Sequence, residues 1–222
     1  MSRGVFVTGT GTNVGKTVVS AAMLHRYRHI APLRYWKAVQ TGIPDDDDTT
    51  TVRLLGTCST EELYPPGYAF PRPLSPHLAA RLSGESVELS YLLRVAAEGG
   101  TSRSWLVEGA GGVLVPLNRN ELMIDLIASL AFPAVIAASS QLGTINHTLL
   151  TIEALRSRGI RVAGVVLVGE LNIENQRAIE TYGEIAVLGA MPRFETLSVS
   201  TLASWSKAEL DRDNYLRPFL AA

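Results

Sequence analysis

The feature that most constrains the fold is a glycine-rich segment between a short apolar run and an apolar helix pattern. Residues 9–17 read Gly-Thr-Gly-Thr-Asn-Val-Gly-Lys-Thr, after the predicted strand Val5–Thr8 and before the predicted helix Gly15–Tyr27. In this context glycines let backbone N–H groups converge on an anion, and the helix N-terminus adds positive potential. We expect Lys16 to bridge the β- and γ-phosphates of a nucleotide, and the Thr17 hydroxyl to ligate Mg²⁺.

The spacing within this loop departs from the standard phosphate-binding pattern. Five residues separate Gly9 from Gly15, so Thr10 stands where the first glycine usually lies. The alternative is a glycine-rich turn before an ordinary helix, but Gly-Lys-Thr opening a helix after the first strand is a specific combination. The segment predicts binding of a nucleoside triphosphate by the loop residues Gly11, Thr12, Asn13, Val14, Gly15, Lys16, Thr17 and Val18.

Short apolar runs alternate with longer amphipathic stretches along the rest of the chain. Near-continuous apolar runs are typical of strands buried on both faces of a parallel sheet. The alternation therefore predicts an α/β P-loop fold, with an open, mostly parallel sheet and helices on both faces. The predicted strands are Val5–Thr8, Tyr35–Val39, Ser104–Glu108, Ala134–Ala138, Val162–Val168 and Ala186–Leu188, and the predicted helices are Gly15–Tyr27, Val87–Ala97, Met123–Leu130, Ile145–Ser157 and Ile173–Tyr182.

The stretch Pro44–Pro76 is the least regular part of the chain. It holds six of the eleven prolines, an acidic run and a predicted short helix near Thr51–Leu55. Because strands continue after it, we interpret it as an excursion near the active site from a single domain spanning residues 1–222. The segment after Ser198 is predicted to be helical and to pack on the outside.

Charge and cysteine content exclude several classes of protein. Lys plus Arg is 20 and Asp plus Glu is 21, a net charge of −1, which argues against a general nucleic-acid binder. Cys58 is the only cysteine, so neither an intrachain disulfide nor a cysteine-based metal site is expected. No apolar run approaches the ~18 residues of a membrane span, and no signal peptide is evident. We expect a cytoplasmic protein without a membrane partner.

Four segments in the same order resemble the motifs of the dethiobiotin synthetase family. The loop at residues 9–17 is similar to the family's Gly-Thr-x-Thr-x-Val-Gly-Lys-Thr. Residues Lys37–Gly42 read Lys-Ala-Val-Gln-Thr-Gly, Val107–Gly112 read Val-Glu-Gly-Ala-Gly-Gly, and Leu142–His147 read Leu-Gly-Thr-Ile-Asn-His. Ser75-Pro76-His77 also has a counterpart, and the resemblance spans about residues 4–192.

The resemblance implies an activity, cofactors and an assembly. Members of the family convert diaminopelargonate, CO₂ (or bicarbonate) and ATP into dethiobiotin, ADP and phosphate, a step of biotin biosynthesis. They require Mg²⁺ and form homodimers whose active sites are shared at the subunit interface. We therefore expect an ATP-dependent ligase with these partners.

Phosphoryl transfer to a carbamate needs positioning and charge neutralisation, which predicts a second cation besides Lys16. Lys37 ends a predicted strand at the carboxyl edge of the sheet, where ligands of α/β proteins bind. We assign Lys37 to the carbamate and the γ-phosphate; the alternative is an ordinary surface lysine. By resemblance, Thr12 and Thr41 hydrogen-bond the carbamate or the substrate amine, and Thr12 joins the two lysines as catalytic.

Mg²⁺ prefers hard oxygen ligands with few protein carboxylates. Thr17 is one predicted ligand, and Glu108, at the end of a predicted buried strand, is the second. The third is an aspartate of the run Asp45–Asp48. Matching the family's aspartate just before its short helix selects Asp48, and Asp47 remains an alternative.

The remaining site residues also follow from the resemblance. The segment Gly143–Asn146 lies at the start of a predicted helix. The resemblance implies that N–H groups of this segment, contributed by the partner subunit, hold the substrate carboxylate. Asn146 could instead be only an N-terminal cap. Glycines after Glu108 are expected to let the ligand approach the backbone. The residues so assigned are Gly109, Gly111, Gly112, Pro192, Arg193 and Phe194 for the nucleotide and Pro76, Gly143, Thr144 and Asn146 for the substrate. The roles of His77 and His147 stay open.

Two alternative functions share the P-loop. Corrinoid-type amidating synthetases carry an added amidotransferase domain with a nucleophilic cysteine, for which this chain offers only Cys58 and little room. Partitioning or switch ATPases act through protein partners and usually carry an extra lysine early in the loop, where this chain has Thr8-Gly9-Thr10.

The sequence departs from the family pattern at two positions, and the second bears on selectivity for the nucleotide base. At the first, Asn13 stands where some family members have an acidic residue. Where the family often has an adenine-reading Asn after its fifth long strand, this chain has Val168. Strong discrimination needs polar groups that the wrong base leaves unpaired. We predict that GTP and CTP support turnover within roughly tenfold of ATP, a difference of about 1.4 kcal/mol or less. Comparing kcat/KM for the three nucleotides tests this, and a thousandfold preference for ATP would show that another group reads the base.

Overall fold

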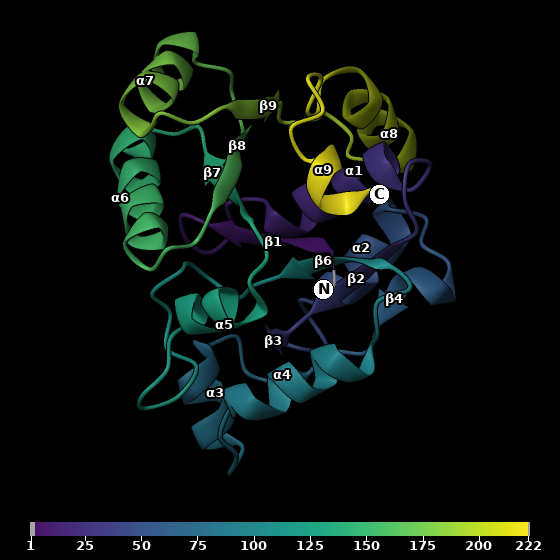
Figure 1. Cartoon of the computed structure of the whole chain (residues 1–222), viewed down its shortest axis with the longest axis vertical. Coiled ribbons are helices and arrows are strands. Elements are labelled where there is room, and N and C mark those ends of the chain that lie inside the picture. The colour runs from purple at the N-terminus through teal and green to yellow at the C-terminus, as the bar shows by residue number, and fades with distance from the viewer. Residues whose placement is uncertain (1–2, 222) are drawn as a thin grey trace.

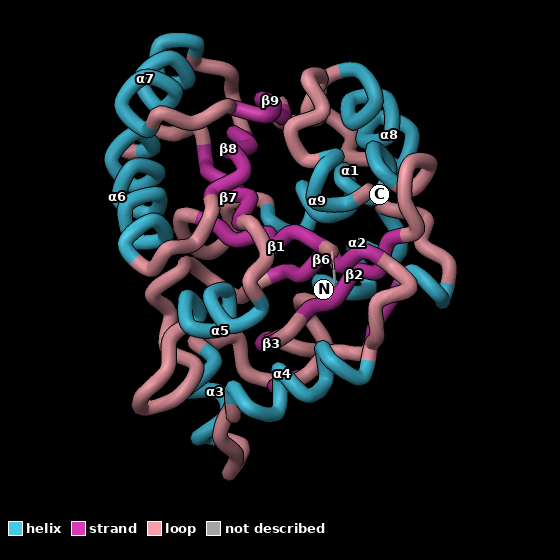
Figure 2. The backbone as a smooth tube through the Cα atoms, viewed as in Figure 1, coloured by secondary structure: helices cyan, strands magenta, loops and turns pink. Residues whose placement is uncertain are grey.

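A seven-stranded parallel sheet is the frame of the molecule in the computed structural model, which describes residues 3–221 (Figures 1 and 2). Every strand pair in this sheet is parallel. In spatial order the strands are β4 (Leu63–Tyr64), β2 (Leu33–Lys37), β6 (Ser104–Glu108), β1 (Gly4–Gly9), β7 (Ala134–Ser139), β8 (Val162–Val168) and β9 (Val187–Met191).

Helices cover both faces of the sheet, as predicted. Successive strand residues point to opposite faces, so Val5 and Val7 pack into one hydrophobic cluster and Phe6 into the other. The first cluster lies under α1 (Lys16–Tyr27), α2 (Asp48–Leu55), α8 (Val199–Ala208) and α9 (Arg217–Leu220). The second lies under α3 (Pro76–Leu82), α4 (Leu89–Glu98), α5 (Met123–Leu130), α6 (Thr144–Ser157) and α7 (Ile173–Gly183).

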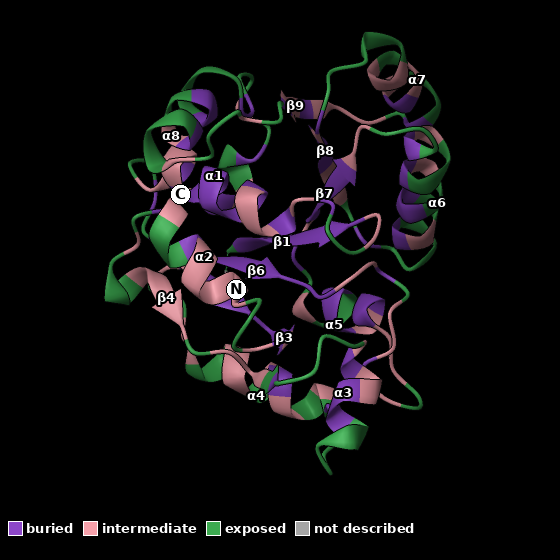
Figure 3. Cartoon of the chain, turned by 180° about the vertical axis from the view of Figure 1, so that it is seen from behind, coloured by how far each residue is buried: buried purple, intermediate pink, exposed green. Residues whose placement is uncertain are grey.

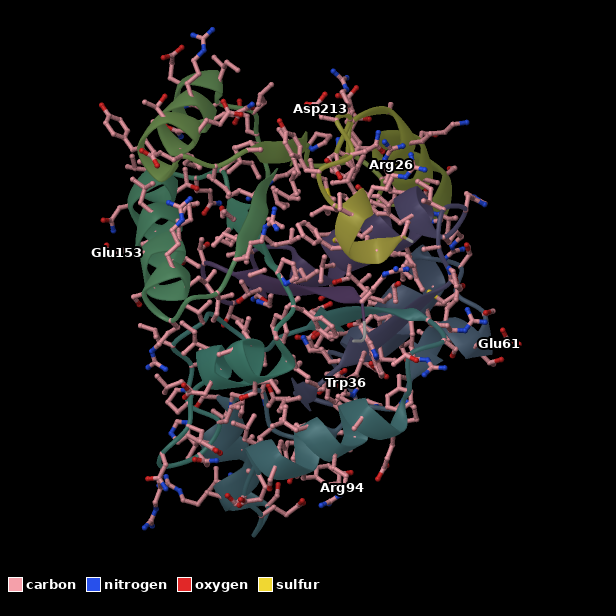
Figure 4. All side chains as sticks on the ribbon, in the orientation of Figure 1. Arg26, Trp36, Glu61, Arg94, Glu153 and Asp213 are labelled. Atoms are coloured by element: carbon pink, nitrogen blue, oxygen red, sulfur yellow. The ribbon has the colours of Figure 1, made fainter. Side chains whose placement is uncertain are left out.

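Burial follows this layered arrangement. The central strands are buried throughout, whereas each outer helix is exposed along one side (Figure 3). Trp36 of β2 lies in the interior between the sheet and α4, while Arg94 and Glu153 extend from the outer helices into solvent (Figure 4). No helix within residues 3–221 combines the length and the apolar character needed to cross a membrane.

The strand order brings three motif-bearing strand ends together. The connection after β1 leads to β2 on one side of β1, whereas the connection after β6 leads to β7 on the other side. Ligands of such sheets bind at the carboxyl ends of the strands where the connections diverge in this way. In register, Glu108 pairs with Val7 on one side and with Lys37 on the other. The predicted phosphate loop, Glu108 and Lys37 therefore share one edge of the sheet.

The region after β2 is more ordered than predicted. The expected strand Tyr35–Val39 is wrong as one element: β2 ends at Lys37, and β3 (Val39–Thr41) pairs with β5 (Tyr68–Phe70) in a separate two-stranded sheet. The stretch Pro44–Pro76 also holds α2, a 3₁₀ turn and β4, elements too short for a periodic sequence pattern. The other predicted strands and helices differ from the observed bounds by at most three residues.

The predicted helix after Ser198 is present as α8, and turns over residues 209–216 connect it to α9. A buried aspartate in these turns anchors the segment. Leu202 and Trp205 of α8 are buried in the same cluster as α1. Asp211 is 1% exposed, and its carboxylate accepts hydrogen bonds from the Leu216 amide at 2.9 Å and from the Tyr27 hydroxyl of α1. These bonds tie the end of the chain to the first helix.

Tyr27→Phe should lower the free energy of unfolding by about 1–3 kcal/mol, because it removes a donor from the buried Asp211 carboxylate. Urea denaturation measures the change. Tyr182→Phe, at a tyrosine that is 76% exposed, serves as the control and should stay within about 0.5 kcal/mol of the wild type. Equal losses in the two variants would contradict the anchoring role of Asp211.

Candidate active site

The loop after β1 has the backbone shape of an anion-binding turn. Asn13 (φ 58°) and Gly15 (φ 93°) adopt left-handed conformations, which directs the chain into α1. Val14 packs into the hydrophobic core beneath the loop, so it offers a ligand only its backbone. A cleft of about 270 Å³ lies over the loop, lined by Thr12, Asn13, Gly15, Lys16, Thr17, Val18, Lys37, Thr41, Asp46, Asp48, Thr51, Ala110 and Gly111.

Glu108 is the centre of the polar network beside this cleft. Its side chain is fully buried, and each of its two oxygens has two partners. Oε1 lies 2.8 Å from Lys37 Nζ and 3.1 Å from the Thr17 hydroxyl. Oε2 accepts hydrogen bonds from the Ser20 and Tyr35 hydroxyls, both at 2.9 Å. Burial and the nearby Glu108 hold the pKa of Tyr35 well above its ordinary value, so its hydroxyl remains a donor.

Lys37 is an ion-pair partner of both carboxylates at the cleft. Its Nζ lies 2.6 Å from Asp48 Oδ2 and 2.8 Å from Glu108 Oε1, and it also donates to the Gly109 carbonyl at 3.0 Å. Burial alone would lower the pKa of Lys37, but the charges of Glu108 and Asp48 outweigh it and raise that pKa. Lys37 is therefore a permanent cation, not the surface lysine of the alternative interpretation.

The surroundings of Lys16 lower the pKa of its ammonium group, whereas those of Lys37 raise it. Its Nζ donates to the Gly11 carbonyl at 2.8 Å, across the loop. Burial, assisted by the charge of Lys37, lowers the pKa of Lys16 to about 8, although Glu108 and Asp48 act in the other direction. An anion bound beside Lys16 would relieve this penalty, as a phosphate-binding lysine requires.

The structure separates the two aspartates between which the sequence left a choice. Asp47 is the N-cap of α2: it accepts hydrogen bonds from the Thr50 amide and from Gln40 Nε2, both at 3.0 Å. Asp48 faces the cleft, where Oδ1 lies 2.6 Å from the Thr17 hydroxyl. Lys37 and Thr17 outweigh the effect of burial and lower the pKa of Asp48, which keeps it ionised.

Thr17, Asp48 and Glu108 therefore form a cluster of hard oxygen donors. Mg²⁺ is usually held by one or two carboxylates together with substrate phosphates and water. The Thr17 hydroxyl is within 3.1 Å of both carboxylates, so the three donors converge on one place beside the phosphate loop. This donor set fits Mg²⁺ in chemistry and in number.

Three predicted residues, Gly109, Gly112 and Pro76, are not among those that line the cleft. A Cβ at Gly109 would lie 2.9 Å from the ring of Phe6, so packing requires a glycine there. A Cβ at Gly112 would lie 3.4 Å from the Gly9 carbonyl oxygen, which places Gly112 against the phosphate loop. Pro76 is buried at the start of α3. Their predicted roles toward ligands stay predictions.

The start of α6 presents backbone amides, as predicted. Gly143 (φ 95°) is the N-cap, so the interpretation of Asn146 as only a cap is wrong. Thr144 is buried and its amide already donates to the Gln141 carbonyl at 3.0 Å. The amides of Ile145 and Asn146 are the ones left for a ligand in this first turn. His147 is exposed and lines a groove next to Thr12.

A second pocket, of about 490 Å³, lies at the carboxyl ends of β7, β8 and β9. Arg193 is in it, whereas Pro192 and Phe194 are not among its lining residues, which are Ser140, Gln141, Leu142, Glu170, Leu171, Asn172 and Arg193.

Val168 packs against Gly15, where a Cβ would lie 2.9 Å from Val168 Cγ1. A Cβ at Gly169 would lie 2.4 Å from the Ser140 hydroxyl, so Ser140 fills the space in front of that position.

Sequence reasoning missed Ser20 and Tyr35, which hold the Glu108 carboxylate of the site, and Gln40, which holds the Asp47 carboxylate at the start of α2. Ser20 and Tyr35 bind Glu108, and Gln40 binds Asp47. The signal that could have found them is spacing, because Ser20 lies three residues after Thr17 on a helix and Tyr35 two residues before Lys37 on a strand.

The chain is similar to proteins of known activity. The family described as an AAA domain matches residues 3–201. Proteins described as ATP-dependent dethiobiotin synthetase BioD are 43% identical in Nitrobacter hamburgensis and 44% identical in Paramagnetospirillum magneticum, over 91% and 90% of this chain and 92% and 93% of theirs. The biotin biosynthesis bifunctional protein BioCD of Bordetella avium is 43% identical over 92% of this chain, which spans only 43% of that longer protein.

Solved structures with a similar fold are distant in sequence. A ParA family ATPase from Chlorobium tepidum superposes with a TM-score of 0.57 at 12% identity, covering 94% of this chain and all of that one. The MinC:MinD cell division complex from Aquifex aeolicus gives a TM-score of 0.54, also at 12% identity, over 93% of this chain and 87% of that one. At this identity the likeness establishes the P-loop fold alone.

The roles of the two aspartates can be separated by substitution. Asp48→Asn should weaken Mg²⁺-dependent binding of ADP about tenfold, because an anionic oxygen is lost beside Thr17. Asp47→Ala should leave this binding unchanged and lower the free energy of unfolding by about 1 kcal/mol through loss of the helix cap. Calorimetric titration with and without Mg²⁺ measures the first effect and urea denaturation the second. The reverse pattern would make Asp47 the ligand.

Proposed function

The chain belongs to the family of ATP-dependent dethiobiotin synthetases, and on that basis we propose that it closes the ureido ring of dethiobiotin from diaminopelargonate, CO₂ and ATP. One observation carries the proposal beyond nucleotide binding. A second buried lysine, Lys37, lies at the end of β2 beside the phosphate loop, held by Asp48 and Glu108. Two cations at one cleft suit a reaction that gathers a carbamate and a triphosphate.

The reaction proceeds in three steps that these residues can assist. One substrate amine adds to CO₂ and loses a proton, giving a carbamate. A carbamate oxygen then attacks the γ-phosphate and ADP leaves, giving a carbamic-phosphoric anhydride. The second amine attacks the carbamate carbon and loses a proton, the carbon–oxygen bond to the phosphoryl group breaks, and the ring is closed as phosphate departs.

Charge neutralisation at the transferred phosphoryl group is the main demand of the second step. Lys16 takes the β- and γ-phosphates, while Lys37 takes the carbamate and γ-phosphate oxygens. Thr12 and Thr41 line the same cleft and orient the carbamate or the amine through their hydroxyls. Thr17, Asp48 and Glu108 would hold Mg²⁺, which neutralises phosphate charge when it is bound.

The alternative functions have less support from the site. An amidating synthetase needs a reactive thiolate, but burial, with the charge of Glu62, raises the pKa of Cys58 to about 11. A partitioning or switch ATPase shares the fold. The sequence identity to this chain is 43% for the dethiobiotin synthetase of Nitrobacter hamburgensis but only 12% for the ParA and MinC:MinD structures. Location in the cytoplasm remains a prediction.

Incubation with diaminopelargonate, bicarbonate and Mg-ATP should yield dethiobiotin, ADP and phosphate, detected by mass spectrometry. Lys16→Ala should abolish this turnover and leave the fold intact, because Lys16 acts on the ligand and only its own carbonyl contact is lost. Circular dichroism checks the fold. Hydrolysis of ATP without any dethiobiotin would instead favour the switch ATPase, and normal turnover in Lys16→Ala would contradict the phosphate role.

We also propose a homodimer in which the start of α6 completes the partner's site. A groove of about 340 Å³ lies between the phosphate loop and α6, and its apolar lining comes from Val113, Leu114 and Val115 and from Leu150 and Ala154 of α6. Two of its leucines are exposed, Leu114 by 59% and Leu150 by 55%, and Leu142 at the start of α6 is also exposed. Exposed leucines gathered around a groove support burial against a second copy.

Hybrid dimers test the shared site. Lys16→Ala removes the phosphate contact, and Asn146→Asp places a negative charge where the substrate carboxylate would bind. Each variant alone should be nearly inactive, but mixing them should restore up to about a quarter of the wild-type activity, since hybrid dimers hold one intact site. Native mass spectrometry verifies subunit exchange. No recovery after exchange would mean that each chain builds its own site.

A further inference from the structure

Glu108 is bound on one oxygen by residues that do not line the cleft. Ser20 and Tyr35 donate to Oε2, and both side chains are fully buried. The other oxygen, Oε1, faces Thr17 and Lys37, which line the cleft. Oε2 of the Glu108 carboxylate is thus bonded to side chains of the protein interior, and Oε1 is bonded to side chains that line the cleft.

The two buried hydroxyls come from the same elements as the two cleft residues. Ser20 lies one helical turn after Thr17 on α1, and Tyr35 lies two residues before Lys37 on the same face of β2. Each element therefore contributes a pair, in which one member faces the cleft and the other holds Glu108. The arrangement ties α1, β2 and β6 to a single carboxylate.

We propose that Ser20 and Tyr35 are positioning residues that set the rotation of the Glu108 carboxylate and so aim Oε1 at the cleft. The last torsion of a glutamate side chain is broad, with no strong preferred angle of its own. Two hydrogen bonds at 2.9 Å on Oε2 restrict that rotation. Outer partners of this kind orient metal ligands, and their loss commonly costs tenfold or more in metal affinity.

The proposal rests on the proposed function only for Glu108 as a ligand of a divalent cation. Its test therefore uses cation binding and not dethiobiotin formation. The probe is Mn²⁺, titrated into the full-length protein with ADP and followed by electron paramagnetic resonance. Tyr35→Phe and Ser20→Ala should each weaken Mn²⁺ binding about tenfold. The double variant should lose less than the product of the single losses, because both hydroxyls act on one oxygen.

Matched controls remove the same chemical groups elsewhere in the same hydrophobic layer. Tyr27→Phe removes a buried hydroxyl from the Asp211 carboxylate, and Ser206→Ala removes one from the Leu202 carbonyl at 2.6 Å. Both controls should lose stability without a change in Mn²⁺ affinity. In the ring-closure assay, Tyr35→Phe should raise the Mg²⁺ concentration for half-maximal rate and leave the KM for diaminopelargonate unchanged.

Wild-type Mn²⁺ affinity in a folded Tyr35→Phe or Ser20→Ala protein would overturn the proposal and leave these hydroxyls a purely structural role. If Tyr35→Phe fails to fold, Ser20→Ala decides the question, because it removes one oxygen from a helix and improves helix propensity. Failure of the proposed function would look different: the wild type would form no dethiobiotin, while the differences in Mn²⁺ affinity would persist.

Discussion

A fully buried carboxylate, Glu108, is the constraint on which the rest of the site depends. A charge removed from water is tolerated only when it is paired and hydrogen-bonded, and here four donors from α1 and β2 meet that need. Satisfying Glu108 therefore fixes the phosphate-loop helix against β2 and brings Lys37 to the edge of the sheet. Asp48 completes the arrangement from α2, since Lys37 pairs with both carboxylates. Removing Lys37 would leave the buried charge of Glu108 without its cation, whereas losing one hydroxyl leaves a single hydrogen bond unmade.

The two lysines share one cleft but differ in electrostatic state. Lys37 has its negative partners within the protein, and its pKa is raised, whereas burial lowers the pKa of Lys16 to about 8. In the unfolded chain Lys16 binds its proton up to about pH 10.5, so between pH 8 and 10.5 the unfolded state holds more protons and stability rises with pH on this account. Below pH 8 the folded protein carries a poorly compensated cation. An anion bound beside Lys16 would relieve this penalty, so stability lost at Lys16 in the free protein would return as affinity for that anion.

Local signals in the sequence predicted much of this molecule, and tertiary contacts decided the rest. Gly-Lys-Thr after a strand and Glu108 at the end of another are visible as patterns, because their chemistry follows from position on one element. The choice between Asp47 and Asp48 depends on which residue caps α2, a matter of one residue that patterns rarely resolve. Gly109 looks like part of a ligand loop, yet it is the ring of Phe6 that requires it. In the sequence, Tyr35 looks like an ordinary core residue, because Glu108, which accepts the hydrogen bond from its hydroxyl, lies on a strand far along the chain.

The pocket at the carboxyl ends of β7, β8 and β9 shares no lining residue with the cleft over the phosphate loop. The loop packs against β8 through Gly15 and the apolar side chain of Val168. At Gly169 the Ser140 hydroxyl occupies the space that a side chain would need, so a longer side chain there would have to displace the Ser140 hydroxyl. The polar side chains of the pocket at the ends of β7 to β9 include Gln141 and Arg193, and both are exposed. Exposed, mobile side chains hold their polar groups less firmly than buried ones, and a base that leaves them unpaired simply leaves them to water.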